Sequence, residues 1–541
     1  MAAKKGKGKG KKKPQLNFSM LSPELSYEYA AADALSTRLL PERFNSEFYA
    51  ANKFIVDLDN EIERVIMFLE EEPLPVNLER ARNLYAVYGE RVEQLKEKLF
   101  EMGGGRFNPN ASGQLGDIMK QAGVPLTKRA PKTGKLSTNK KIMAQFKDHP
   151  FVIALSKYRT ELRGMNANIR PFILAGKETC YVKYNTLAVP TGRFSSGRKE
   201  KKSYGTPFFL PYNIQSVSKP KSALYAFELS NAVDSILGYK FYLPPMDVPE
   251  GTELLLVEGC EPDNVRSIIM PWNDHYVLSV DYKAEEIVVA ANLSEDQAFL
   301  KPLIEGRDPH KSTAIDMFGL ENYNKDKRKK GKIANFGELY LGTEKMILDS
   351  LPDLTWEEAT EIIRLWRKVH HQYIEWVEKC CALARQTGFV KSLMGRIRHV
   401  AYYFQIDPDF AMRTVANTQI QGCGGDILRY ILVRLFYEIV HNPVYAEKCR
   451  WLATVHDEVD FSVTKNYRDF TEIALTIGRL MTTLPFGWTL PRYKPLEVDF
   501  SVGNSWGDIF PFEFRQDEGL WRPKGSVHIF KGGKWIEKEK D

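Results

Sequence analysis

Two strand-like segments that lie far apart in the chain both end at acidic residues, and they constrain the fold more than any other feature. "YVLSV", residues 276–280, is an apolar run followed by Asp281 and then by a helical pattern. "LATVHDEVDFSV" is typical of a strand, a tight turn and a second strand, with His456, Asp457 and Glu458 at the turn. An Asp at a strand end is more often a turn former or helix cap than a ligand. If the strands are neighbours, however, Asp281 and Asp457 can hold two magnesium ions through hard oxygen ligands.

A second feature is the stretch "RKKGKIANFGELY", which places Arg328, Lys332, Phe336 and Tyr340 four residues apart. In a helix this spacing puts the four side chains on one face. Arg binds phosphate through its planar fork and Lys acts as a point charge, while two aromatic rings suit a sugar and a base. The pattern therefore predicts a binding face for a nucleoside triphosphate. The plainer alternative is a solvated basic face followed by aromatic core residues.

Two glycines interrupt the same predicted helix. Gly331 and Gly337 each cost about 1 kcal/mol relative to Ala inside a helix. Such positions are expected where a ligand or another backbone comes close.

Composition indicates an intracellular globular chain of several domains. The 541 residues suffice for three or four domain cores, and the sequence has no apolar run long enough for a membrane span. The six cysteines have no metal-ligand spacing and are expected to be reduced thiols. The net charge of +7 resides in the opening "MAAKKGKGKGKKKP", either a non-specific nucleic-acid arm or a solubilising or artificially added tail.

Helical and strand-like patterns divide the chain coarsely. Residues 47–170 are predicted to be mostly helical, and one long amphipathic helix is expected between a capping Asn77 and a stop at Gly103. Residues 171–280 are strand-like and broken by Pro and Gly, whereas 282–450 are again helical. The segment 510–541 has no evident purpose. Between helices, the loop "KRAPKTGKLSTNKK" has no acidic residue and is either a solvated tip or a grip on a phosphate backbone.

These motifs together resemble DNA polymerase family A, the bacterial polymerase I type that many phages also carry. Its nucleotide-binding helix, R-x-x-x-K-x-x-x-F/Y-G-x-x-Y, is matched by residues 328–340. Its first and last catalytic motifs, D-Y-S-Q-I-E and H-D-E, are similar to "DYKAEE" at Asp281 and "VHDEV" at Asp457. "TGRFSS", "GRDPHKSTAIDMFG" and "RTVANTQIQG" are similar to three further family motifs, and all six follow the family order.

The resemblance implies an α+β right-hand polymerase fold, in which the palm contains an antiparallel sheet and the fingers and thumb are helical. The expected divisions are a tail (1–20), a remnant resembling the end of an exonuclease domain (21–46), the thumb (47–170), a first palm part (171–280) with an insertion at about 197–262, the first palm motif (281–300), the fingers (301–400), a second palm part (401–509) and a C-terminal extension (510–541).

The resemblance also implies a role for individual residues in DNA synthesis. Asp281, Asp457 and the backbone carbonyl of Tyr282 are expected to ligate two Mg²⁺ ions, which Mn²⁺ can replace, and Glu458 and Lys332 to support catalysis. The residues expected to contact the dNTP are Glu286, His310, Arg328, Lys332, Phe336 and Tyr340. Those expected to contact primer-template DNA are Arg193, Asn213, Gln215, Arg413, Asn417, Gln421, His456, Lys128, Arg129, Lys132 and Lys135.

Within that set, Glu286 is the expected steric gate that refuses ribonucleotides, and Tyr340 is expected to stack at the template position. Phe336 predicts poor acceptance of dideoxynucleotides.

Some positions depart from the family pattern. Lys283, Ala284 and Glu285 replace Ser-Gln-Ile, Val288 replaces an Arg, and Leu341 stands where Gly usually follows the final Tyr. These departures concern primer contacts, fidelity and finger motion.

"YEYAAADALSTRLL" resembles the last motif of a proofreading exonuclease, Y-x-x-x-D, at Tyr29 and Asp33. The other metal-ligating carboxylates of such a nuclease are absent before it, so the chain is expected not to proofread alone. A separate exonuclease or replisome protein is then an expected partner of a monomeric, cytoplasmic enzyme of phage type.

Two other functions remain open at this point. A single-subunit RNA polymerase shares the palm and the cationic stripe, but Glu286 at the gate favours DNA synthesis. A non-catalytic or partner-dependent DNA-binding homologue explains the basic tail and loop, but it has no need for both Asp281 and Asp457.

Overall fold

The computed structural model describes most of the chain. The described residues are 35, 50, 52–129, 134–138, 143–197, 208–211, 213–217, 221–229, 239–242, 248–351, 353–485 and 494–538. The Lys/Gly tail, Tyr29, Asp33 and Lys132 lie outside them. The chain divides into two compact units, Met1–Asp57 and Leu58–Asp541, and the helix α3 (Lys53–Glu71) begins in the first. The following paragraphs concern the second unit.

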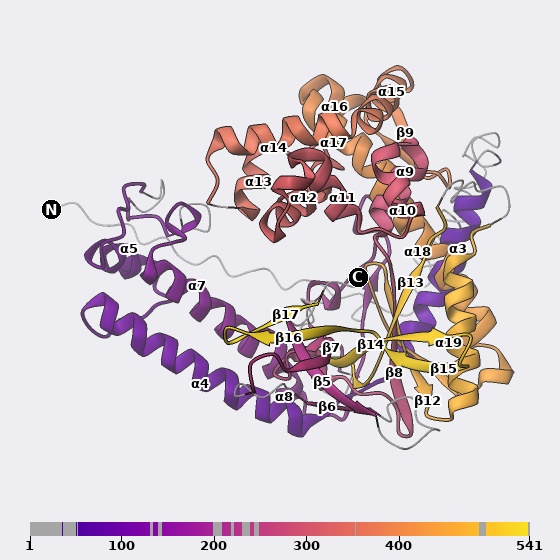
Figure 1. The fold of residues 1–541 in the computed structure, drawn as a ribbon, viewed down its shortest axis with the longest axis horizontal. Coiled ribbons are helices and arrows are strands. Elements are labelled where there is room, and N and C mark those ends of the chain that lie inside the picture. Colours follow the sequence, from indigo (N-terminus) through magenta and orange to yellow (C-terminus); the bar gives the residue numbers. More distant parts are fainter. Residues whose placement is uncertain are drawn as a thin grey trace. The chain divides into compact units, whose positions relative to one another are not determined.

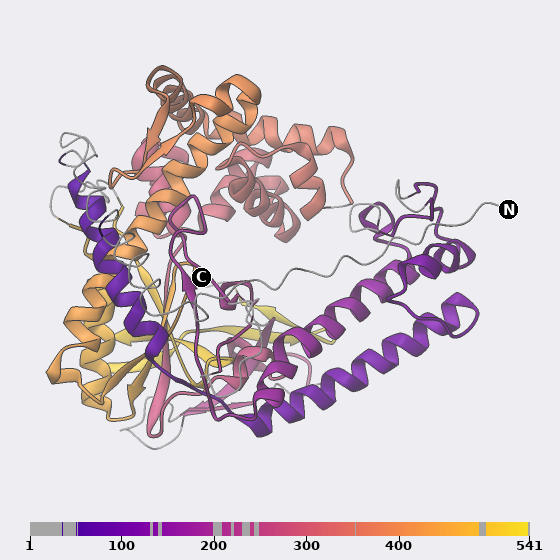
Figure 2. The ribbon, with the colours of Figure 1, turned by 180° about the vertical axis from the view of Figure 1, so that it is seen from behind.

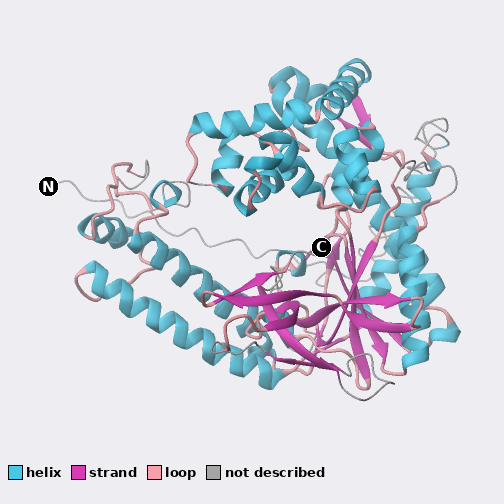
Figure 3. Ribbon diagram, viewed as in Figure 1, coloured by secondary structure: helices cyan, strands magenta, loops and turns pink. Residues whose placement is uncertain are grey.

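An antiparallel sheet of six strands forms the centre of this unit (Figures 1 and 3). In spatial order the strands are β11 (Cys449–Val455), β12 (Glu458–Thr464), β8 (His275–Tyr282), β13 (Val498–Ser505), β14 (Asp508–Arg515) and β15 (Leu520–Pro523). Both strand-like segments of the sequence are therefore confirmed as strands, and they are direct neighbours. Residues 275–280 of β8 are all buried, which explains why this strand is apolar without alternation.

Helix α19 (Tyr467–Thr482) packs against the sheet. Asn466 caps it by accepting a hydrogen bond from the Asp469 amide, and its apolar face is buried. The ring of Phe470 contacts Tyr276 of β8 and Trp521 of β15, with centroids 6.3 and 5.8 Å apart.

A second sheet has five strands, in the order β17 (Lys534–Glu537), β16 (Gly525–Lys531), β7 (Glu253–Cys260), β5 (Ser222–Leu229) and β6 (Tyr239–Tyr242). It joins the region predicted as an insertion to the C-terminal segment that had no assigned purpose. The two sheets meet where Tyr225 contacts Phe510, with ring centroids 5.2 Å apart. Gly259 permits this contact, because a Cβ there would lie 2.5 Å from the Phe510 ring.

Long helices form a hairpin that Figure 2 shows running side by side: α4 (Leu78–Gly103) and α7 (Pro150–Arg163). Asn77 caps α4 through a hydrogen bond from the Arg80 amide, and Gly104 ends it with a φ of +74°. Leu99 of α4, Leu115 of α5 (Ser112–Gln121) and Phe151 of α7 share a core. The predicted start and end of α4 are confirmed. A π-helical turn, η3 (Gly164–Ile169), leads into α8 (Arg170–Ala175).

The segment after β8 is helical, as predicted. Its elements are α9 (Glu285–Ser294), α10 (Gln297–Ile304), α11 (Pro309–Phe318), α12 (Lys325–Glu338), α13 (Glu344–Ser350), α14 (Trp356–Val369), α15 (His371–Thr387), α16 (Ala401–Ile406), α17 (Pro408–Asn417), α18 (Cys423–Leu435) and the π-helical turns η7 (Thr418–Gly422) and η8 (Phe436–Val440).

Short elements complete the described part. The two-residue strands are β1 (Leu74–Pro75) with β2 (Thr179–Cys180) and β3 (Tyr184–Asn185) with β4 (Ser195–Ser196), and β9 (Phe389–Lys391) pairs with β10 (Ile397–His399). The 3₁₀ turns are η2 (Ala144–Phe146), η4 (Ile214–Ser216), η5 (Val265–Ile268), η6 (Leu320–Asn322) and η9 (Pro443–Tyr445).

All six cysteines lie in the described part and are free thiols, as expected. None of the described helices combines the length and the apolar composition that a membrane span requires.

A network of buried ions ties α3 to the helical segment. Arg396 binds both oxygens of Asp59 at 2.8 Å, and Arg429 binds the same carboxylate at 2.9 Å. Arg396 also donates to Asp426 of α18 at 2.5 Å. Burial acts to raise the pKa of Asp59, but the hydrogen bonds and charges of Arg396 and Arg429 hold it below its ordinary value. The network therefore depends on one carboxylate that serves two arginines.

We expect Asp59→Ala to lower the free energy of unfolding by about 3 kcal/mol, because two buried guanidinium groups lose their shared counter-ion. Urea denaturation measures this change. Asp57→Ala is the matched control on the same helix: its carboxylate forms an exposed pair with Lys53, and its loss should cost less than about 0.5 kcal/mol. Equal effects of the two substitutions would contradict the prediction.

Candidate active site

Strand pairing brings the two predicted acidic residues to one end of the sheet. Asp281 on β8 lies opposite Glu458, the first residue of β12, and Asp457 directly precedes Glu458 in the turn after β11. His456 takes a φ of +59°, which makes the turn tight. The prediction of neighbouring strands is confirmed, although the chain between the two carboxylates includes the whole helical segment.

A cavity of about 340 Å³ opens at this end of the sheet. It is lined by Arg193, Glu285, Glu286, Phe336, His456 and Asp457, among others. Five of these six residues were singled out in the sequence, on four separate motifs. Their convergence at one place is the main finding about the site.

Glu285 is the sixth residue, and motif reasoning recorded it only as a departure from a family pattern. Its side chain is buried, with 3% of its surface exposed. Burial, reinforced by the charge of Asp457 and more weakly by those of Glu286 and Asp281, raises the pKa of Glu285 to about 8 against the opposing charge of Arg193. The Glu in place of Ile was the signal that could have identified an additional carboxyl group here.

Space for Glu285 comes from α18. A Cβ on Gly424 would lie 2.8 Å from a carboxyl oxygen of Glu285, closer than side-chain atoms approach each other. Ala284, just before α9, takes a left-handed φ of +49°. The backbone therefore turns sharply between Asp281 and Glu285.

Glu286, the expected sugar gate, is bound by Arg193 at 2.8 Å. Tyr340 lies close to Glu286 and Arg193. Burial and then the charge of Glu286 raise the pKa of the Tyr340 hydroxyl above its ordinary value, and the charge of Arg193 opposes them. The ring of Phe336, on the facing helix, is 42% exposed. This exposure argues against the alternative in which the stripe ends in core aromatics.

Helix α12 carries the cationic stripe. Arg328 and Lys332 lie on it with Phe336, but the helix ends at Glu338, so the prediction that Tyr340 belongs to it is wrong. The amide of Gly342 bonds to the carbonyl of Gly337, and Leu341 takes a φ of +51°; together they close the helix before Tyr340.

The two glycines of α12 lie against neighbouring helices. A Cβ at Gly331 would be 3.0 Å from the carbonyl oxygen of His310 on α11, and one at Gly337 would be 2.0 Å from the side chain of Met346 on α13. The expected close approach is thus to other segments of the chain.

His310 sits beside the cations of α12. Its Nδ1 is 3.1 Å from the Asn335 side-chain nitrogen, and its ring centroid is 5.4 Å from that of Phe336. Burial lowers the pKa of His310 to about 4, and the nearby charges of Lys332 and Arg328 add to this effect while Asp308 opposes it. Arg328 is bound to Asp308 at 2.6 Å.

The Glu458 side chain is bound by an arginine. Its carboxylate accepts a hydrogen bond from Arg266 at 2.9 Å, and the Arg266 guanidinium lies 4.2 Å from the ring centroid of Trp506. Its role is therefore to hold the turn in place, while His456 and Asp457 line the cavity.

The predicted DNA-contacting residues lie in several places. Asn213 accepts hydrogen bonds from Ser196 and from the Gln215 amide, which makes it a local cap. Asn417 donates to Gln421 at 2.9 Å, and Arg413 lies one turn earlier on α17. Lys128, Arg129 and Lys135 are in the loop after α5, at the end of the helical hairpin remote from the six-stranded sheet (Figure 1). Arg129 donates to the Gly134 carbonyl at 2.8 Å.

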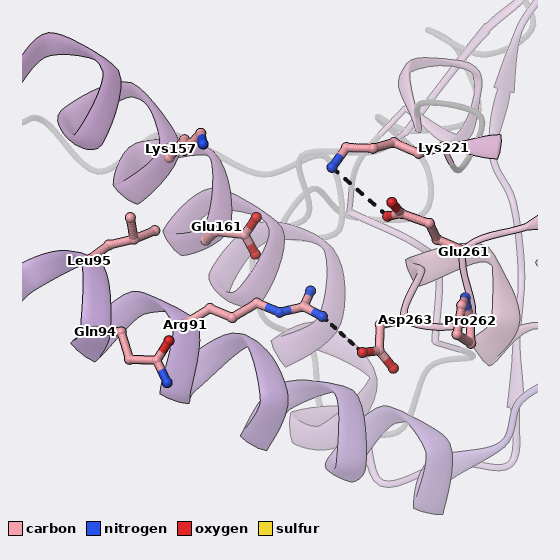
Figure 4. Close-up of a pocket in the computed structure, with 9 residues that line it drawn as sticks. All are labelled: Arg91, Gln94, Leu95, Lys157, Glu161, Lys221, Glu261, Pro262 and Asp263. Carbon is pink, nitrogen blue, oxygen red and sulfur yellow. Dashed lines mark hydrogen bonds and ion pairs between the residues drawn. The ribbon is translucent and has the colours of Figure 1, made fainter. Parts of the chain in front are cut away.

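A larger cavity, of about 570 Å³, lies between the helical hairpin and the second sheet (Figure 4). Four of its charged side chains form two pairs: Arg91 binds Asp263 at 2.8 Å and Lys221 lies 3.9 Å from Glu261. None of the residues predicted for a functional site lines this cavity. We therefore assign the site to the smaller one.

The donor set at the sheet end fits a hard divalent cation. Asp281 and Asp457 offer carboxylate oxygens, and their negative charge is felt by Glu285. Among the described residues, no three His, Cys, Asp or Glu side chains are grouped to hold a metal ion. Mg²⁺ commonly combines one or two carboxylates with substrate and water oxygens.

Residues 254–508 match the sequence model of DNA polymerase family A. The DNA polymerase I of Thermus aquaticus is 25% identical over 467 residues, which are 83% of this chain and 48% of the relative. That of Bacillus subtilis is 25% identical over 517 residues, 93% of this chain and 51% of the relative. The chain thus spans about half the length of these family A relatives.

A solved structure confirms the right-hand polymerase fold. The POL domain of Pol1 from M. smegmatis, in complex with DNA primer-template and dNTP, superposes with a TM-score of 0.63 at 18% sequence identity. The match covers 83% of this chain and 70% of that one.

The raised pKa of Glu285 predicts a pH-dependent stability. The folded state holds a proton that the unfolded chain releases above about pH 4.5, so in metal-free buffer stability should fall as pH rises from about 4.5 to about 8. Glu285→Gln removes this linkage, so its Tm should exceed that of the wild type increasingly toward pH 8. The exposed Glu375→Gln is the control and should follow the wild-type profile. A Tm difference that is constant with pH would refute the assignment.

Proposed function

We propose that the chain is a DNA-templated DNA polymerase that adds dNTPs to a primer 3′ end with two divalent metal ions. The observation that carries this proposal is the convergence of Asp457, Glu286, Arg193 and Phe336 on one cavity, at the end of the strand that bears Asp281. The family match of residues 254–508 supports it. Under this proposal, α4 to α8 form the thumb, the six-stranded sheet the palm, and α10 to α15 the fingers.

Asp281, Asp457 and the backbone carbonyl of Tyr282 would hold Mg²⁺, or Mn²⁺ in its place, through oxygen ligands. The bound metal would supply activation of the primer hydroxyl and neutralisation of the leaving pyrophosphate. Arg266 restrains Glu458 at 2.9 Å and thereby orients the Asp457 turn. The protein's own contribution is to hold these carboxylates in place before the substrate arrives.

The triphosphate is held by the residues around the first half of α12. Lys332 is exposed, and His310 lies beside it with a pKa low enough to keep the ring neutral at ordinary pH. Arg328 would exchange its contact with Asp308, at 2.6 Å, for phosphate oxygens. Toward the other end, Phe336 and Tyr340 would flank the sugar and the base, and Glu286 would occupy the space of a 2′-hydroxyl.

The DNA would run from the cavity along the helical hairpin. Arg193, Gln215, His456 and the pair Asn417–Gln421 lie on segments next to the palm, and Arg413 extends that set along α17. Lys128, Arg129 and Lys135 would bind phosphates without reading sequence, as a loop of cations does. Asn213 would act by fixing the backbone around Gln215.

Asp457→Ala should reduce primer extension by at least about 10³-fold, because an anionic metal ligand is lost, and should leave DNA affinity within about twofold. A gel assay of extension and a fluorescence-anisotropy assay of binding measure the two effects. Asp499→Ala is the matched control: Asp499 lies opposite Asp281 in β13 but forms ion pairs with Lys283 and Lys524. DNA binding without any extension by the wild type would favour a non-catalytic scaffold.

Glu286→Ala should raise ribonucleotide incorporation relative to deoxynucleotide incorporation by at least about tenfold, because the side chain that excludes the 2′-hydroxyl is removed. The ratio of kcat/KM for matched ribo- and deoxynucleotides checks this. Deoxynucleotide incorporation in the same preparation reports on folding. Unchanged sugar discrimination would show that another residue is the gate.

A further inference from the structure

Three side chains from three helices form a buried series that ends at His310. The indole nitrogen of Trp366 on α14 donates to Oδ1 of Asn335 on α12 at 2.7 Å. Nδ2 of Asn335 lies 3.1 Å from Nδ1 of His310 on α11. Trp366 and Asn335 are both fully buried, so water does not compete for the contact between them, whereas His310 is half-buried. Neither Trp366 nor Asn335 belongs to the residues that the motifs singled out.

The chemistry of these groups allows only one arrangement of hydrogens. An indole N–H can donate but cannot accept, so the amide atom that faces it must be the oxygen of Asn335. The amide nitrogen then faces His310, and it can only donate. Nδ1 of His310 must therefore accept, and in a neutral ring the single proton is on Nε2.

Because the His310 ring is neutral, its tautomer decides which of the two nitrogens can donate a hydrogen bond. Burial brings the pKa of the His310 ring to about 4; of the charged groups around it, Lys332 and Arg328 add to this effect and Asp308 opposes it. At neutral pH His310 cannot donate from both nitrogens, so its ability to bind an anion depends on which nitrogen holds the proton.

We propose that Trp366 is a positioning residue which, through Asn335, fixes His310 as the Nε2–H tautomer and so makes it a hydrogen-bond donor to the triphosphate of the incoming nucleotide. This inference rests on the proposed polymerase function, because it concerns the same nucleotide site. The indole acts on the substrate only through the other two residues.

Packing around Trp366 is suited to this role. Its ring contacts those of Phe299, His370 and Tyr373, with centroids 6.1, 4.5 and 5.9 Å apart. His370 is held by Asp296 at 3.0 Å, and Tyr373 donates to the Leu339 carbonyl just after α12. The indole cannot rotate away from Asn335 without disturbing these contacts.

Helices α14 and α12 are also joined by an ion pair. Arg367, the residue after Trp366, donates to Glu338 at the end of α12 at 2.7 Å. Trp366 and Asn335 therefore remain opposite each other if α12 moves as part of this helical segment.

The first experiment reads the tautomer without any polymerase assay. Protein labelled with ¹³C,¹⁵N-histidine is studied by solid-state NMR, and His310 is assigned by comparison with His310→Gln. We expect a proton on Nε2 in the wild type. In Asn335→Asp, which is isosteric, both side-chain oxygens accept, so a proton should appear on Nδ1. A wild-type ring protonated on Nδ1 would overturn the proposal, and this result needs no polymerase activity.

The second experiment is kinetic. Trp366→Phe should raise KM for dNTP about tenfold with little change in kcat, and it should have no further effect in the His310→Ala background, because both substitutions remove the same contact. In Asn335→Asp, KM should fall as pH is lowered, because the doubly protonated ring again donates from Nε2. Independent, multiplicative effects of Trp366→Phe and His310→Ala would overturn the proposal.

Trp451→Phe is the matched control for loss of a buried indole. Trp451 is 1% exposed, packs on Phe461 and makes no indole hydrogen bond among the described residues. The Trp451→Phe substitution should lower Tm as Trp366→Phe does, but it should leave KM for dNTP unchanged. If the Nε2–H tautomer is found but neither Trp366→Phe nor His310→Ala alters nucleotide binding, the hydrogen-bond series stands and the assignment of this site to a triphosphate fails.

Discussion

The pairing of β8 between β12 and β13 is the constraint on which the rest of the structure depends. This strand is buried along almost its whole length and has an antiparallel neighbour on each side, so its register cannot shift without exposing apolar side chains. The same register sets Asp281 opposite Glu458. A carboxylate is thereby placed at the end of a rigid strand, and a second one, Asp457, in the turn beside it.

The charged groups around this strand end come from two parts of the fold. The sheet and α9 supply carboxyl groups, including the buried Glu285, whereas α12 supplies Arg328 and Lys332. A buried carboxyl group with a raised pKa, such as Glu285, is costly for the folded state, and it persists only where the surrounding packing imposes it. Gly424 and the left-handed turn at Ala284 are the local features that impose it here.

The second sheet shows how distant segments complete the fold. β16 comes from the last part of the chain and pairs with β7, which lies before the first catalytic strand. Through the contact of Tyr225 with Phe510, this sheet supports the edge of the six-stranded one. The C-terminal segment is thus an integral part of the same folded unit.

Local patterns in the sequence were sufficient to predict β8, the two strands around the Asp457 turn, the caps of α4 and the course of α12, because periodicity and capping act over a few neighbouring residues. Of the cavity residues, Arg193 and Glu286 came only from the resemblance to family motifs. Sequence did not predict the pairing of β16 with β7, the end of α12 before Tyr340, or the buried position of Glu285. Each of these depends on a contact with residues far away in the chain, such as Gly424 for Glu285. The series from Trp366 to His310 is of the same kind: residue types define which atoms can donate, but only tertiary packing decided which groups meet.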